Sequence, residues 1–358
     1  MINAVIGMGF GDEGKGCTVD WLCSLYSDSL VVRYSGGHQA GHHVKHDDKE
    51  HIFSNFGSGS LRGNPTYWSE KCTIDPVGIR EEYKKLCEIG ILPKLYINKN
   101  CPVTTPEDKL ANMTNKTTLE HGSCGVGFFE TLKRQKAMYS LIAGDLFCQS
   151  AMEFKYAEIQ KFYDNVNTIL SESFFESVEW MKRCNLITIV DGLPSNQSII
   201  FEGSQGLLLD QNIGFFPHVT PSDVGDKYFR DEYISIDHHY FVTRAYQTRH
   251  GNGPMTDKGE IQFVEKEIFE KTNKENQFQN KMRATMLDLD LLKWGLDRNG
   301  KVCGDKTIVI TCLEHLKVWS FWHDGQVFTT NSKKDFCVKI KNILEFDNVV
   351  MCDNYTFT

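Results

Sequence analysis

Residues 7–16 read Gly7-Met8-Gly9-Phe10-Gly11-Asp12-Glu13-Gly14-Lys15-Gly16, and they stand directly behind the short apolar run Ala4-Val5-Ile6. The apolar run predicts a strand, and the residues from Cys17 to Tyr26 predict a helix. Glycines between a strand and a helix, closing on a lysine, let backbone N–H groups approach a phosphate closely. The stretch is therefore predicted to bind phosphate.

The spacing of this loop fits a known phosphate-binding pattern only in part. Gly9 to Lys15 has the G-x-x-x-x-G-K spacing of a P-loop, but Gly16 stands where that motif needs a Ser or Thr hydroxyl for magnesium. Asp12 and Glu13 would repel a polyphosphate unless a metal ion intervenes or they face another ligand. These two acids indicate a site of chemistry rather than a passive turn.

A second glycine-rich loop follows a second predicted strand, Leu30-Val31-Val32-Arg33. It reads Ser35-Gly36-Gly37-His38-Gln39-Ala40-Gly41-His42-His43. The histidines lack the separated pairing of a structural zinc site, and no cysteine lies near them, so zinc is disfavoured. A loop histidine beside a phosphate loop is better interpreted as a donor to phosphoryl oxygens or as a general acid.

Length and composition set wider bounds. A chain of 358 residues with 41% hydrophobic content can bury a large core, and we expect one elaborated α/β domain over residues 1–358. A net charge of −8 argues against nucleic acid as a partner. Twelve cysteines without a C-x-x-C pair, no secretory leader and no membrane-length apolar stretch lead us to expect a cytoplasmic protein with reduced thiols.

Strand and helix patterns alternate along the chain. This alternation predicts a central, mostly parallel sheet with helices on both faces. The predicted strands are Asn3–Ile6, Leu30–Tyr34, Leu95–Asn98, Leu186–Val190, Ser198–Phe201, Tyr240–Tyr246, Thr307–Thr311 and Asn348–Met351. The further predicted helices are Val77–Glu88, Tyr139–Ile142, Ala151–Leu170 and Val264–Thr272.

The two glycine-rich loops resemble the signature loops of the adenylosuccinate synthetase family. The matching runs are Gly11-Asp12-Glu13-Gly14-Lys15-Gly16 and Arg33-Tyr34-Ser35-Gly36-Gly37-His38-Gln39-Ala40-Gly41-His42. The likeness continues through Ser58-Gly59-Ser60-Leu61, Cys101-Pro102, Gly144-Asp145-Leu146-Phe147, Phe201-Glu202-Gly203-Ser204-Gln205-Gly206, Pro217-His218-Val219-Thr220 and Thr248-Arg249-His250-Gly251-Asn252-Gly253-Pro254. Order and spacing hold over most of the chain.

This resemblance implies a ligase reaction in two steps. A nucleoside triphosphate phosphorylates the 6-oxygen of a purine monophosphate, and the amine of L-aspartate then displaces phosphate. Phosphoryl transfer needs positioning and charge neutralisation more than covalent catalysis. By resemblance, Asp12 takes the proton from N1 of the purine and His42 donates to the transferring phosphoryl group.

The resemblance also assigns binding residues. The triphosphate would be held by Gly11, Glu13, Gly14, Lys15, Gly16, Cys17, Gly41 and His42, and Mg²⁺ by Asp12 and the carbonyl of Gly41. The purine monophosphate would be held by Asp12, Gln39, Ser123, Cys124, Arg134, Gln205, Leu209 and Thr220. L-Aspartate would contact Lys281 and Arg283, and the triphosphate's base would contact Cys312 and Glu314. The family also implies a homodimer in which an arginine, here Arg134, reaches the partner's nucleotide phosphate.

Several positions depart from the family pattern. The family motif T-K-x-D, which binds guanine, appears here as Thr311-Cys312-Leu313-Glu314. This change weakens the case for GTP and makes an adenine nucleotide a strong candidate for the phosphate donor. The aspartate loop keeps only Lys281 and Arg283 as cations, and the 5′-phosphate loop reads Gly122-Ser123-Cys124-Gly125-Val126-Gly127.

These changes resemble the short bacteriophage branch of the family, which joins L-aspartate to dGMP with ATP or dATP for 2-aminoadenine DNA. One feature disagrees, because some phage enzymes carry serine where this chain keeps Asp12. The alternative within the family is the ordinary enzyme, which acts on IMP with GTP.

Two alternatives from other classes stay open at this point. A P-loop NTPase that does conformational work would need a Ser or Thr after Lys15, and Gly16 counts against it. A catalytically silent nucleotide-binding scaffold would have no use for the intact set of Asp12, Lys15 and His42.

Overall fold

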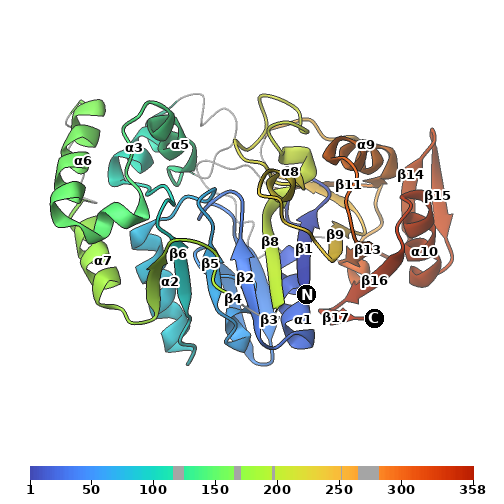
Figure 1. The fold of residues 1–358 in the computed structure, drawn as a ribbon. Coiled ribbons are helices and arrows are strands. Elements are labelled where there is room, and N and C mark those ends of the chain that lie inside the picture. Colours follow the sequence, from blue (N-terminus) through green and yellow to red (C-terminus); the bar gives the residue numbers. More distant parts are fainter. Residues whose placement is uncertain (116–124, 165–170, 196–197, 251, 265–281) are drawn as a thin grey trace.

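A large twisted sheet runs through the whole molecule (Figure 1). The computed structural model describes residues 1–115, 125–164, 171–195, 198–250, 252–264 and 282–358. Within these residues the sheet has ten strands in the order β17-β16-β13-β9-β1-β8-β2-β5-β6-β7. Every neighbouring pair is parallel except β16 with β17, which is antiparallel. The predicted mostly parallel sheet is confirmed.

The strands of this sheet are short and mostly buried. Their bounds are β1 Ile2–Gly7, β2 Ser29–Arg33, β5 Thr66–Trp68, β6 Leu95–Asn98, β7 Ile187–Val190, β8 Ser198–Gly206, β9 His238–Arg244, β13 Asp305–Thr311, β16 Asn348–Asp353 and β17 Thr356–Phe357. Three smaller sheets accompany it. They consist of β3 His42–His46 with β4 Lys49–Phe53, β10 Gln247–Arg249 with β11 Arg283–Thr285, and β12 Leu287–Asp288 with β14 Trp319–His323 and β15 Gln326–Thr330.

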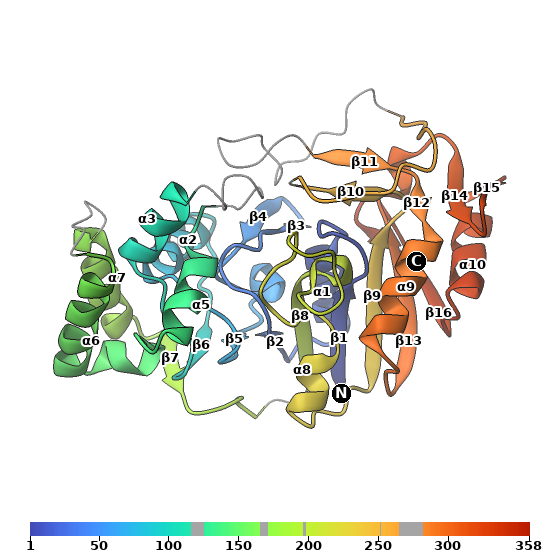
Figure 2. The same cartoon turned by 90° about the horizontal axis from the view of Figure 1, so that it is seen from above.

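Helices cover both faces of the sheet, as the alternation of elements predicted. The α-helices are α1 Lys15–Leu25, α2 Pro76–Glu88, α3 Pro106–Thr114, α5 Phe128–Lys136, α6 Gln149–Phe162, α7 Ser171–Arg183, α8 Lys227–Asp231, α9 Leu289–Asn299 and α10 Lys333–Ile343. The 3-10 turns are η1 Ser58–Arg62, η2 Ala143–Phe147, η3 Leu207–Leu209 and η4 Leu313–His315. Figure 2 shows α6 and α7 at one end of the molecule and α10 at the other.

The side chains of β1 alternate between two cores, because successive residues of a strand point to opposite faces. Ala4 and Ile6 belong to the core that also contains buried residues of α8, α9 and α10. Val5 packs on the opposite face with Val19 and Leu22 of α1. The central strand is therefore covered on both sides, which explains its apolar run Ala4-Val5-Ile6.

The helix predictions hold where the pattern is long. The predicted helix Val77–Glu88 corresponds to α2, and Ala151–Leu170 corresponds to α6 as far as Phe162, whereas residues 165–170 lie outside the described residues. The helix Val264–Thr272 also lies outside them beyond Val264.

The predicted helix Tyr139–Ile142 is wrong. Leu141 instead accepts a backbone hydrogen bond from Val103 at 2.9 Å, and Ile142 forms a bridge with Pro102. Four residues are too few to form a helix without support, so pairing with a neighbouring segment wins.

The glycine-rich loops meet at one edge of the sheet. The phosphate loop follows β1, the histidine loop follows β2, and the segment that begins with Cys312 follows β13. Parallel strands place these connections at their common carboxyl edge, where ligands bind in open α/β sheets. Among the described helices, none is long and apolar enough to cross a membrane.

Candidate active site

The phosphate loop is held closed by an ion pair between two of its own residues. Lys15 Nζ donates to Glu13 Oε2 at 2.7 Å, and both side chains are buried. The other carboxylate oxygen, Glu13 Oε1, accepts from the backbone N–H groups of Gly9 at 3.1 Å and Gly11 at 2.8 Å. The groups that the sequence predicted to face a phosphate thus surround a carboxylate of the same loop.

This carboxylate is ionised despite its burial. Burial alone would raise the pKa of Glu13, but the adjacent Lys15 ammonium and the N–H of Gly11 outweigh it, and the pKa is lowered from its ordinary value. The loop therefore provides a strongly anion-binding environment.

The backbone of the loop is strained and clamped from two strands. Asp12 has φ 64° and Gly14 has φ 92°, both in the left-handed region. Arg244 at the end of β9 donates through Nε to the carbonyl of Asp12, and Thr311 Oγ1 at the end of β13 donates to the carbonyl of Glu13 at 2.8 Å. Aspartate tolerates this backbone better than most residues, and the clamps hold it there.

Gly14 has room for no side chain. A Cβ at this position would lie 3.0 Å from Thr311 Cγ2, and the residue's φ already favours glycine. Gly14 also directly precedes α1, so its conformation sets the direction in which the helix starts. Both facts explain the glycine before the lysine.

Gly16 is equally constrained, and this explains the missing hydroxyl of the P-loop pattern. A Cβ at Gly16 would lie 2.9 Å from the Cβ of His42 and 3.1 Å from Ser58 Oγ. The first turn of α1 is therefore packed against the histidine loop, and a Ser or Thr would collide with it.

His42 is fixed by a buried carboxylate. Its Nδ1 lies 2.5 Å from Glu202 Oε1 of β8, and Glu202 also accepts from the hydroxyl of Ser58 and from its N–H, the latter at 3.1 Å. The other ring nitrogen, His42 Nε2, is buried and has no hydrogen-bond partner in the part of the chain that the structure describes. The imidazole is thus oriented from one side and open on the other.

The charge state of this pair follows from its surroundings. Burial lowers the pKa of His42, and the neighbouring Glu202 opposes that effect without overcoming it. Burial acts to raise the pKa of Glu202, but His42, Arg33 and Ser58 lower it to about 2. The free site therefore holds an ionised carboxylate facing an imidazole that burial keeps from gaining a second proton.

Several residues that were predicted to bind the purine monophosphate lie near Gly11. A Cβ at this glycine would lie 3.3 Å from Gln205 Oε1 and 3.8 Å from Leu209 Cδ1. Thr220 donates its backbone N–H to the carbonyl of Leu209 at 2.7 Å. The carboxylate of Asp12, with 22% of its side chain exposed, lies 3.5 Å from Nε2 of His250. The structure thus brings Gln205, Leu209 and Thr220 to the phosphate loop.

The other loop histidines do not share a ligand. His38 Nε2 lies 2.9 Å from the carbonyl of Val126, and His43 pairs with Glu50 on the neighbouring strand. Gln39 lies at the glycines of its own loop, since a Cβ at Gly37 would lie 3.0 Å from its Oε1. Gly41 directly precedes β3, which carries His42. The three histidines of this loop thus have separate partners.

Arg134 points into the chain's own interior and not toward another subunit. Its side chain is fully buried, where it forms a bidentate pair with Asp108 at 2.9 Å and donates to the carbonyls of Val103 and Tyr139. These contacts do not support the role across a dimer that the resemblance gave to this residue. The run of basic residues at the end of α5 gave no sign of this burial.

The predicted aspartate and 5′-phosphate residues are only partly described. Arg283 lies on β11 and donates to the carbonyl of Gly253 at 2.6 Å. Ser123, Cys124 and Lys281 lie outside the described residues. Cys17 is described, and burial raises the pKa of its thiol well above the ordinary value, so it sits beside the phosphate loop as a neutral group.

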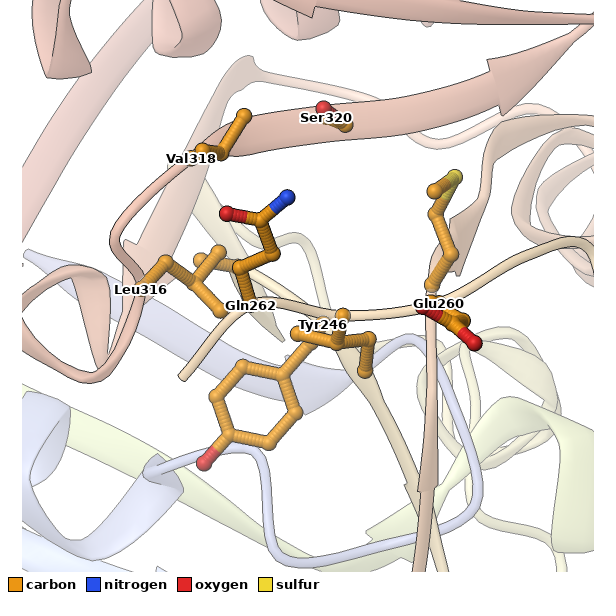
Figure 3. Close-up of a pocket in the computed structure, with 9 residues that line it drawn as sticks. Tyr246, Glu260, Gln262, Leu316, Val318 and Ser320 are labelled. Atoms are coloured by element: carbon orange, nitrogen blue, oxygen red, sulfur yellow. The ribbon is translucent and has the colours of Figure 1, made fainter. Parts of the chain in front are cut away.

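The segment that would contact the triphosphate's base has unusual local structure. Cys312 has φ 56°, and one carboxylate oxygen of Glu314, Oε2, is buried without a hydrogen-bond partner among the described residues. Beside this segment, a cavity of about 40 Å³ is lined by Tyr246, Glu260, Gln262, Leu316, Val318 and Ser320 (Figure 3). Ligand pockets usually measure roughly 300–1,000 Å³, so this cavity suits a few waters and not a purine.

Sequence reasoning missed two residues that the geometry makes prominent. Glu202 is completely buried in β8 and holds His42, and His250 stands beside Asp12. An acid directly behind the apolar run Ile199-Ile200-Phe201 is a signal that could have found Glu202, because buried charges are paired. His250 lies in the run from Thr248 to Pro254, and the sequence of this run gives no sign of the contact with Asp12.

Comparisons with known proteins agree on one family. The family model described as adenylosuccinate synthetase matches residues 4–339. The adenylosuccinate synthetase of Legionella pneumophila (strain Lens) is 29% identical over 343 residues, covering 88% of this chain and 78% of the relative. That of Buchnera aphidicola subsp. Baizongia pistaciae is 30% identical over 355 residues, covering 89% and 80%.

Two solved structures share the fold. The fully ligated adenylosuccinate synthetase of Plasmodium falciparum superposes with a TM-score of 0.77 at 17% identity, covering 98% of this chain and 96% of that one. The cyanophage S-2L succinoaminodeoxyadenylate synthetase, bound to dGMP and to dATP as an energy donor, gives a TM-score of 0.65 at 18% identity, covering 98% and 92%.

Proposed function

The chain belongs to the adenylosuccinate synthetase family, whose members are nucleotide-dependent ligases that form a carbon–nitrogen bond with L-aspartate, and we propose that its own substrates are dGMP and ATP or dATP. The product would be N6-succino-2-amino-2′-deoxyadenylate, with ADP or dADP and phosphate. A chain with these substrates would belong to the bacteriophage branch of the family.

The observation that carries this choice is the altered base-contacting segment. The family's lysine is replaced by Cys312, and the acid at 314 is a glutamate with one buried, partnerless carboxylate oxygen within the described residues. Such an oxygen accepts a hydrogen bond from an exocyclic amine, which adenine carries at position 6 and guanine at position 2, so the choice between the two bases rests on the reach of the side chain. A glutamate is also one methylene too long for the usual aspartate's grip on guanine, and recognition of this kind depends on reach.

The residues around the phosphate loop support the roles that the family assigns. Asp12 would remove the proton from N1 of the purine, and Lys15 would leave Glu13 to hold triphosphate oxygens. His42 would donate from Nε2 to the phosphoryl group in flight, while Glu202 acts as a positioning residue that fixes the ring through Nδ1. The negative charge of the arriving triphosphate favours the second proton that this donation requires.

Mg²⁺ fits the proposed donor set. Asp12 offers a partly exposed carboxylate and Gly41 a backbone carbonyl, and hard oxygen donors are the ligands this ion prefers. When bound, the ion would neutralise charge on the phosphates. Arg244 fixes the loop that carries this carboxylate, because it donates a hydrogen bond to the carbonyl of Asp12.

The second candidate within the family is the ordinary reaction of IMP with GTP. The bacterial relatives favour this reaction, because they are named adenylosuccinate synthetases and align with most of this chain.

We also propose a homodimer, because the family implies one. No arginine is assigned to the contact between the subunits, because Arg134 is buried within its own chain. Light scattering of the purified protein tests the dimer.

One competition assay tests the substrates. The purified protein is given dGMP, GMP and IMP together with L-aspartate, each triphosphate in turn, and the products are identified by mass spectrometry. We expect the succino product of dGMP, formed with ATP or dATP in preference to GTP. If a product forms only from IMP and only with GTP, the enzyme catalyses the ordinary reaction and the proposal is wrong. Phosphate release without L-aspartate would favour an NTPase, and tight nucleotide binding without turnover would favour a scaffold.

A further inference from the structure

An imidazole that the family roles do not use stands beside the proposed catalytic carboxylate. His250 Nε2 lies 3.5 Å from Asp12 Oδ2, and 17% of the histidine side chain is exposed. Both of its ring nitrogens are buried and lack a hydrogen-bond partner in the described part of the chain. Buried polar atoms normally have a hydrogen-bond partner, so we infer that a ligand supplies the partner that the protein does not.

The backbone places His250 there. Phe10 of the phosphate loop forms a parallel bridge with Arg249, which brings the next residues of both segments alongside each other. Arg249 is anchored in turn, because it donates to the carbonyls of Pro254 at 2.7 Å and His218 at 2.9 Å. Its guanidinium also lies over the ring of Phe10, 4.2 Å from the centroid. The position of His250 relative to Asp12 is therefore set by the fold.

Base chemistry says what a group in this position would meet. In guanine, the 2-amino group is bonded to the carbon next to N1, whereas hypoxanthine has only a C–H there. If Asp12 takes the N1 proton, as proposed above, a side chain that adjoins its carboxylate on the same edge lies within reach of the 2-amino group. A site built to bind an N–H group rejects the analogue that lacks it, because its own polar atom is left unpaired.

We propose that His250 reads the 2-amino group of the purine monophosphate and thereby selects guanine over hypoxanthine. This inference rests on the proposed function for the placement of the base, and it names the substrate class of the same site. Nε2, the ring nitrogen that adjoins Asp12, would donate to its carboxylate, which leaves the lone pair of Nδ1 to accept from the amine. Hypoxanthine would leave that lone pair buried and unpaired.

The test compares dGMP with dIMP, since the two differ only in the 2-amino group. Dissociation constants are measured by titration calorimetry for the wild type, His250→Val and His250→Asn. We expect the wild type to prefer dGMP by about tenfold or more, on the scale of one hydrogen bond to a buried group. His250→Val should bind the two equally. His250→Asn, whose side-chain oxygen stands near the place of Nδ1, should recover part of the preference.

Two comparisons exclude simpler explanations. His323→Val is the matched control, because His323 belongs to β14, a strand at the end of the molecule away from β1 (Figure 2), and it should keep the wild-type ratio. If His250 contacts the sugar instead, His250→Val will change the ratio of dGMP to GMP and leave that of dGMP to dIMP intact, which overturns the inference.

The inference and the proposed function fail in different ways. An unchanged dGMP-to-dIMP ratio in a folded His250→Val variant rejects the role of His250, whatever the enzyme does. Absence of aspartate-dependent phosphate release in the wild type rejects the proposed reaction, while the binding ratio still decides what His250 recognises. A folded state is verified by thermal unfolding of each variant.

Discussion

Asp12 combines a left-handed backbone with a partly exposed carboxylate, to which we have assigned the role of base. Replacing Asp12 with Asn keeps the size and the tolerance of the backbone conformation but removes the base. We expect Asp12→Asn to abolish turnover while triphosphate binding is retained, as measured by phosphate release and calorimetry. Asp47→Asn is the matched control, because Asp47 also has a positive φ, 54°, in an exposed turn. Near-normal turnover in Asp12→Asn would remove Asp12 from the mechanism.

His42 and His43 are neighbours on the same strand with different surroundings. His42 is buried against Glu202, whereas His43 pairs with Glu50 near the surface. Loss of a general acid or transition-state donor slows a reaction by roughly a hundredfold or more, and we expect this of His42→Ala in kcat. His43→Ala should stay close to the wild-type rate. Equal effects of the two substitutions would contradict the assignment.

The place of a residue in the fold could be predicted from sequence where the residue belongs to a motif. It could not be predicted where it depends on which buried partner the residue has. The positions of Asp12, Lys15 and His42 follow from loops beside predicted strands, and the structure does place those loops at one edge. Arg134 shows the opposite case, since a basic residue in a helix reveals nothing about an acid such as Asp108, which lies on another helix. Their pairing depends on tertiary contacts alone.

At the scale of elements, the junction of β1 with α1 depends on one backbone conformation. Gly14 and Gly63 both have positive φ, but a Cβ at Gly63 would meet nothing within 4 Å, whereas one at Gly14 would press on Thr311. Alanine in a left-handed conformation costs about 1–2 kcal/mol. We expect Gly63→Ala to lower the free energy of unfolding by that amount and Gly14→Ala to lower it by more, in urea denaturation. If the two substitutions have equal effects, Thr311 is able to give way.

Elements with a long periodic pattern were predictable, and short ones were not. The twelve residues predicted for α2 carry enough helical period to be recognised, and the observed helix spans Pro76–Glu88. The four residues from Tyr139 to Ile142 carry too little, and they pair with Pro102 and Val103, which sequence patterns cannot foresee. The pairing of β3 with β4 was missed for a related reason, because histidines and charges mask the strand pattern.

The whole molecule should lose stability in acid in a way that traces to one buried pair. The pKa of Glu202 is lowered to about 2 and that of His42 is lowered from 6.5, so the unfolded chain binds protons at both groups before the folded chain does. Their contribution is present above about pH 6.5 and is lost as the pH falls through that value and then from 4.5 toward 2.

Urea unfolding of the wild type and Glu202→Gln between pH 7 and pH 3 measures this contribution. The variant should be less stable at pH 7 by about 1–3 kcal/mol, because it leaves buried donors poorly paired. Its stability should also fall less steeply below pH 4.5, where the wild type loses the ionised carboxylate. Parallel curves for the two proteins would show that Glu202 does not titrate as assigned.

The ion pair between Lys15 and Glu13 determines what an incoming phosphate meets first. Glu13 already occupies the N–H groups of Gly9 and Gly11 and the ammonium of Lys15, so an incoming phosphate meets a tethered competitor instead of a vacant cradle. A small anion from the solution makes few contacts, so it competes poorly with the Glu13 carboxylate, which is covalently attached to the loop. A nucleotide that brings several phosphate groups and a base can win the exchange, so the loop discriminates by the number of simultaneous contacts before any chemistry begins.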